Sequence, residues 1–112
     1  MDKSESLEQM LESAKKYAEE GAVTIMESCL ILAKTYAQKA GKDISREVER
    51  IKRRGYKKAV PLELESAKKY AEEGAVTIME SCLILAKTYA QKAGKDISRE
   101  VERIERGGYK KE

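Results

Sequence analysis

Residues 11–51 read LESAKKYAEEGAVTIMESCLILAKTYAQKAGKDISREVERI, and the same 41 letters return unchanged at residues 64–104, an offset of 53. A joint at residues 52–63 separates the two copies. Substitutions at exposed helix positions change stability by less than about 0.5 kcal/mol, so these positions drift first after a natural duplication. The Lys, Glu and Gln positions are nevertheless identical. We therefore expect a deliberate fusion of one unit to itself rather than a recent natural duplication.

Glycine placement divides the first copy into helices. Gly21 follows a run with apolar residues at three- and four-residue intervals, which predicts a helix that ends with Gly in the left-handed conformation. The alternative is a helix that continues through Gly21, since Gly inside a helix costs only about 1 kcal/mol. That alternative gives one long and one short helix per copy and a four-helix bundle.

Two more helices are expected after Gly21. The second covers about residues 25–40, with Thr24 and Glu27 as its capping box. Its many apolar residues predict that well over half of its circumference is buried. Asp43 is expected to cap a short third helix over about residues 44–54.

Gly55 and Pro61 are expected to separate the copies. Gly55 is predicted to end the third helix, and Pro61 suits the first position of the next one. The expected fold is all-α, a single domain over residues 1–112 with three helices per copy and six in the chain. Two identical halves are expected to pack about a pseudo-two-fold axis, as in a homodimer, either within one chain or exchanged between chains.

Composition argues against catalysis. The 112 residues contain no His, which removes Ser/His/Asp and Cys/His arrangements, and no phosphate-binding or metal-binding motif occurs. We expect no enzyme activity and no cofactor. Cys29 and Cys82 are one position in the two copies, which is neither a disulfide framework nor a zinc site. Cys29–Ala33 is the longest apolar run, too short to span a membrane. No secretion signal is recognised, so a reducing, cytoplasmic setting, or recombinant production only, is expected.

The net charge of +3 is concentrated after the first copy. Residues 52–58 read KRRGYKK, with five cations and no acid, whereas the matching segment 105–112 has three cations and two acids. Cations of this kind bind phosphates, and a Tyr ring stacks on a base. The candidate nucleic-acid contacts are Lys52, Arg53, Arg54, Tyr56, Lys57 and Lys58. A charged helix end followed by a linker is the favoured interpretation, because the cluster is weaker in the second copy.

The sequence favours a structural role. The leading hypothesis is an engineered single-chain tandem duplication of a helical, homodimer-like unit that assembles with itself and has no catalytic role. The alternative is a natural helical interaction module that binds protein or nucleic acid through residues 52–58.

Overall fold

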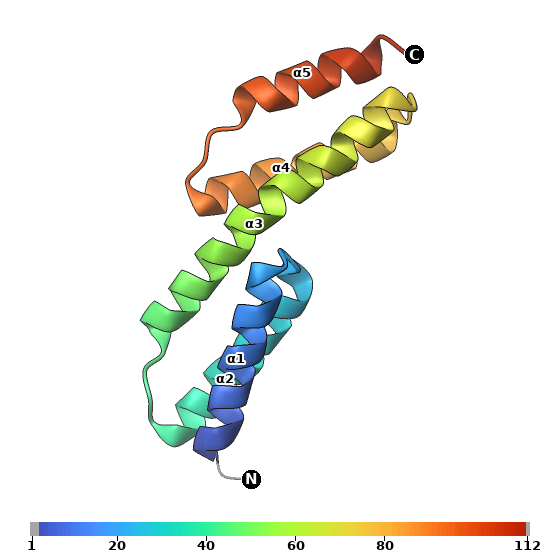
Figure 1. The fold of residues 1–112 in the computed structure, drawn as a ribbon. Coiled ribbons are helices and arrows are strands. Elements are labelled where there is room, and N and C mark those ends of the chain that lie inside the picture. Colours follow the sequence, from blue (N-terminus) through green and yellow to red (C-terminus); the bar gives the residue numbers. More distant parts are fainter. Residues whose placement is uncertain (1–2, 112) are drawn as a thin grey trace. The chain divides into compact units, whose positions relative to one another are not determined.

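The computed structural model describes the backbone of residues 3–111 and the side chains of residues 5–111. Over this range the chain is helical and contains no strand, which confirms the all-α prediction. Five helices are present instead of the six expected. They are α1 (Lys3–Glu19), α2 (Val23–Ala40), α3 (Ser45–Glu72), α4 (Val76–Ala93) and α5 (Ser98–Tyr109) (Figure 1).

The helices form two compact units that divide between Lys58 and Ala59. Unit 1 contains α1, α2 and the part of α3 up to Lys58, and unit 2 contains the rest of α3 with α4 and α5. In unit 2 the core is a cluster of buried residues from all three helices, namely Ala67, Ala71, Met79, Leu83, Val101 and Ile104. Each unit is thus a three-helix bundle with a core of aliphatic, Ala and Met side chains.

The predicted break at Gly21 is confirmed. Gly21 has φ 70°, and the N–H of Ala22 donates to the carbonyl of Tyr17 at 2.9 Å. This six-to-one hydrogen bond is the Schellman ending of a helix, which requires a left-handed residue. The alternative with a helix through Gly21 is therefore wrong. The capping box at Thr24 and Glu27 is also wrong, because α2 begins at Val23 with Ala22 as its N-cap and no side-chain cap hydrogen bond.

The turn before α3 follows the prediction in part, because Asp43 bonds to the start of the helix but lies one residue before Ile44, whose carbonyl accepts the first helical hydrogen bond from Val48. Gly41 ends α2 in the left-handed conformation. Asp43 then accepts hydrogen bonds on Oδ1 from the Ser45 backbone N–H at 3.0 Å and from the Ser45 hydroxyl at 2.6 Å. A carboxylate in this place satisfies an N–H that has no partner within the helix.

Helix α3 overturns two expectations, since neither Gly55 nor Pro61 interrupts it. Gly55 is buried, and a Cβ built there would collide with the Met26 sulfur, so this Gly serves close packing of α3 on α2. Pro61 is exposed. Pro has no backbone N–H to donate to the carbonyl of Lys57, four residues earlier. Lys57 is exposed, so water can donate to that carbonyl instead.

The burial expected around α2 is too wide. Its buried face is one stripe made of Val23, Met26, Leu30, Ala33 and Ala37. Ile25, Ile31 and Leu32 are 48%, 63% and 47% exposed. Within a three-helix unit α2 has only two neighbours, and they leave the remainder of its circumference uncovered.

Candidate functional site

A second apolar line lies beside the buried stripe of α2. Ile25, Cys29, Leu32 and Tyr36 recur at intervals of four, three and four residues, so they share one helix face. Each of them comes directly before a buried residue, and one residue turns the helix by about 100°. The row therefore lies on one side of the buried stripe. The equivalent residues of α4 are Ile78, Cys82, Leu85 and Tyr89. We call these two sets the apolar rows; Ile78 and Leu85 are 49% and 42% exposed.

A groove in unit 1 collects most of the predicted basic residues. It has a volume of about 770 Å³ and lies between α1 and the first part of α3. Its cations are Lys15, Arg46, Arg50, Arg53, Arg54 and Lys57, and its carboxylates are Glu19 and Glu49. We call it the basic groove. Two buried residues, Ala18 and Ile51, also line it.

Unit 2 has the equivalent groove in a smaller form, about 250 Å³ in volume. Its charged lining residues are Lys68, Glu72, Arg103 and Lys111. Gly107 stands where unit 1 has Arg54, so one wall lacks its long cationic side chain.

One ion pair crosses the basic groove. The Arg54 Nε contacts Glu19 Oε1, joining α3 to α1. The hydrogen bond from Arg54, followed by its charge, lowers the pKa of Glu19, and the charge of Lys58 acts in the same direction. Glu19 therefore remains a carboxylate and holds Arg54 in place.

The structure separates the six predicted nucleic-acid contacts. Arg53, Arg54 and Lys57 line the basic groove, whereas Lys52, Tyr56 and Lys58 do not. Tyr56 is only 5% exposed, and its hydroxyl donates to Glu27 Oε2 at 2.7 Å. Its ring is therefore not available to stack on a base, and that part of the prediction is corrected. The phosphate contacts proposed for the cations stay a prediction.

Sequence reasoning missed three groove residues, Lys15, Arg46 and Arg50. The signal was present in their spacing, because Arg46, Arg50 and Arg53 fall on one face of a continuous helix with Lys57. The predicted helix over residues 44–54 already held these three arginines, but attention to the 52–58 cluster left out Arg46 and Arg50. Lys15 lies on α1, and its approach to α3 depends on tertiary packing.

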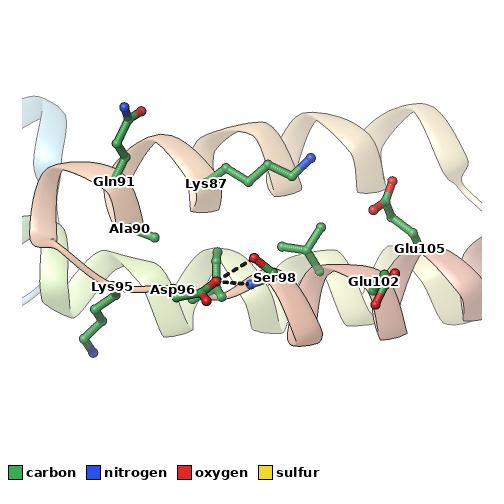
Figure 2. A pocket seen from close by; sticks show the side chains of 10 residues that line it. Lys87, Ala90, Gln91, Lys95, Asp96, Ser98, Glu102 and Glu105 are labelled. Atoms are coloured by element: carbon green, nitrogen blue, oxygen red, sulfur yellow. Dashed lines mark hydrogen bonds between the residues drawn. The ribbon is translucent and has the colours of Figure 1, made fainter.

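A different hollow occurs where the turn leads into the last helix of each unit. In unit 2 it is about 560 Å³, and its equivalent in unit 1 is about 450 Å³. Figure 2 shows Lys87 and Gln91 on α4, with Glu102 and Glu105 on α5. Asp96 accepts hydrogen bonds from the Ser98 hydroxyl at 2.5 Å and its backbone N–H at 3.0 Å. These bonds, the hydroxyl's first, lower the pKa of Asp96 and hold the turn before α5, whose N-cap residue is Ile97.

The remaining reactive groups do not form a catalytic set. Cys29 and Cys82 are free thiols. Partial burial, followed by the charge of Glu63, raises the pKa of the Cys82 thiol and so weakens it as a nucleophile. In the part of the chain that the structure describes, no group of His, Cys, Asp or Glu residues is placed to hold a metal ion.

Comparison with known proteins gives no assignment. No family matches the chain, and neither a curated protein nor a solved structure is significantly similar to it. None of the described helices has the length and apolar character needed to cross a membrane.

Proposed function

We propose that this chain is an engineered single-chain duplication of one helical unit with a structural, self-assembling role and no catalytic activity. The observation that carries the proposal is the apolar row on both α2 and α4. Neither row belongs to the fully buried stripe of its own helix. Its Ile and Leu members are exposed, whereas its Cys and Tyr members are partly buried, and Cys82 packs against the core of unit 2. Exposed large apolar side chains on one face, here Ile25 and Leu32 with their equivalents Ile78 and Leu85, are typical of a surface that packs against another protein.

The repeat supplies a partner of matching shape. Both rows come from the same letters, so pairing of one row with the other is an isologous contact like that of a homodimer. Such pairing is possible within a chain about a pseudo-two-fold axis or between chains. Cys29 and Cys82 lie near the middle of their rows, where an isologous contact brings equivalent residues together.

Disulfide formation tests this pairing. Under mild oxidation we expect the chain to form a Cys29–Cys82 disulfide bond. The molar mass from light scattering then shows whether the bond lies within a monomer or joins two chains. The double variant Leu32→Glu, Leu85→Glu is expected to abolish the bond and any dimer. The matched control is Ile31→Glu with Ile84→Glu, which changes exposed apolar residues on another face. Equal disulfide yields in both double variants would reject the proposal.

The gene tests the engineered origin independently. Synonymous recoding of one copy relative to the other supports synthesis. Identical codons within a genome would support recent natural duplication instead.

Binding through residues 52–58, as a natural interaction module, is the second candidate function. The observation that favours it is the position of Arg53, Arg54 and Lys57 in one groove with three further cations.

A further inference from the structure

We infer that the basic groove of unit 1 binds the phosphate backbone of duplex nucleic acid without regard to base sequence. The inference rests on the second candidate function, because both bring nucleic acid to α3. It names a different set of contacts, however, in which Lys15, Arg46 and Arg50 take part and Lys52, Tyr56 and Lys58 do not.

The cations of α3 form a line of suitable length. Arg46, Arg50, Arg53, Arg54 and Lys57 are exposed and lie on one face of an uninterrupted helix. From the first to the last, the helix rises roughly 17 Å. One strand of B-form DNA carries about five phosphates over that length. Lys15 on α1 supplies a cation from the other wall.

The side-chain types favour phosphate over other acidic partners. Four of the six cations are Arg, whose planar guanidinium binds phosphate oxygens through two parallel hydrogen bonds. The apolar lining residues, Ala18 and Ile51, are buried, so the groove offers nothing to insert into a lipid surface.

The absence of an aromatic lining residue favours duplex over single strands. Proteins that bind single strands stack bases on aromatic rings. The nearby Tyr56 is buried and bonded to Glu27, and no aromatic residue lines the groove. Contacts to the backbone position a duplex but carry no base information, so affinity is expected to follow charge and salt.

The experiment measures binding of the full chain to a labelled mixed-sequence DNA duplex of about 20 base pairs by fluorescence anisotropy between 50 and 200 mM salt. Arg54 is paired with Glu19, so five cations remain for phosphate contacts, which give a slope of log K against log salt of up to about −4.5. We expect Arg46→Gln with Arg50→Gln to reduce the slope by nearly two units and the affinity at least tenfold. Circular dichroism checks that the variants remain folded.

The matched control is Lys52→Gln with Lys58→Gln, which removes the same charge from the 52–58 segment outside the groove. We expect it to lose threefold or less in affinity. A larger loss of affinity in this control than in the arginine variant would overturn the assignment of binding to the basic groove. It would instead support binding through residues 52–58. No binding at 50 mM salt would overturn both, and tighter binding to single strands or anionic vesicles would overturn the duplex inference.

A second pair of variants tests the groove through its ion pair. Glu19→Gln releases Arg54 and is expected to tighten duplex binding about threefold or more. Glu72→Gln makes the same charge change in unit 2, where Gly107 replaces the arginine, and is expected to have a smaller effect. Equal effects of the two variants would overturn the assignment to unit 1.

Discussion

Unit 1 and unit 2 share several hydrogen bonds 53 residues apart, yet their third helices differ in sequence and in exposure. Tyr56 donates to Glu27 at 2.7 Å, and Tyr109 donates to Glu80 at the same distance. Outside the repeated stretch, however, Arg54 is replaced by Gly107 and Lys52 by Glu105. Tyr56 is 5% exposed and Tyr109 is 42% exposed.

This difference shows that core packing and surface chemistry are separable in the unit. The two Met side chains at the centres are both fully buried, and each lies over a helical Gly. The charged groove beside this packing changes from six cations to three, while the contact of Met with Gly at the centre is the same in both units.

Removing the central Met is expected to have the largest effect. Met26→Ala deletes a fully buried side chain and should destabilise the protein by about 2–5 kcal/mol. Met79→Ala removes its equivalent and should cost the same to within about 0.5 kcal/mol. Urea unfolding followed by circular dichroism measures both. A twofold difference between the variants would show that the two cores are not energetically equivalent.

The Gly beneath each Met gives the next largest effect. Gly55→Ala and Gly108→Ala place a methyl group against the Met sulfur, an overpacking of about 1–3 kcal/mol. Better helix propensity returns up to about 1 kcal/mol, so a net loss is expected from thermal unfolding.

Two controls separate packing from propensity. Gly107→Ala meets nothing within 4 Å and should be neutral or stabilising. In a Met26→Ala background, Gly55→Ala should become stabilising because the space is empty. A stabilising Gly55→Ala in the native background would contradict tight packing here.

Alkaline titration of Tyr109, in unit 2, gives the next expected effect. The hydrogen bond to Glu80, with smaller contributions from Glu105, raises the pKa of Tyr109 to about 12. The bond's contribution to folding is therefore full below the ordinary value of 10 and is lost as pH rises from 10 to 12. The tyrosinate absorbance step near pH 12 should be missing in Tyr109→Phe. Glu105→Lys, which copies unit 1, should lower that step; an unchanged step would contradict the role of Glu105.

The smallest expected difference concerns the thiols. Glu63 stands near Cys82, whereas unit 1 has Met10 at the equivalent place. In a Cys29→Ser background, Glu63→Met should lower the Cys82 pKa and speed its labelling at pH 8 by about twofold. The same change in a Cys82→Ser background should leave Cys29 labelling unaltered. If Cys82 does not respond, Glu63 does not govern its pKa.

Local turn chemistry made part of the fold predictable. Gly21 and Gly41 end helices in the left-handed conformation, and Asp43 bonds to the start of the helix that follows. These interactions join residues that are close in sequence, so the local sequence is sufficient to predict them. The duplicate turn in unit 2 forms the same bonds, with Asp96 in the place of Asp43.

The length of helix α3 was not predictable from the positions of Gly and Pro alone, because tertiary packing determines where this helix ends. Gly55 and Pro61 are ordinary signals for a stop and a start, but buried Tyr56, Ala59 and Val60 continue the helical spacing between them. Packing of that face outweighs the local preference of Gly and Pro. The same error separated Lys57 from the four arginines of the basic groove, and the sixth cation, Lys15, comes from α1.

The identity of α2 and α4 has a consequence for folding kinetics. Both are the same 18 letters, so each helix is an equally good occupant of the other's place, and only chain connectivity distinguishes correct from exchanged docking. Two near-degenerate arrangements roughen the folding landscape. We therefore expect dilute refolding to favour the neighbouring segment, and refolding at high protein concentration to recruit the same segment from another molecule and to give domain-swapped oligomers.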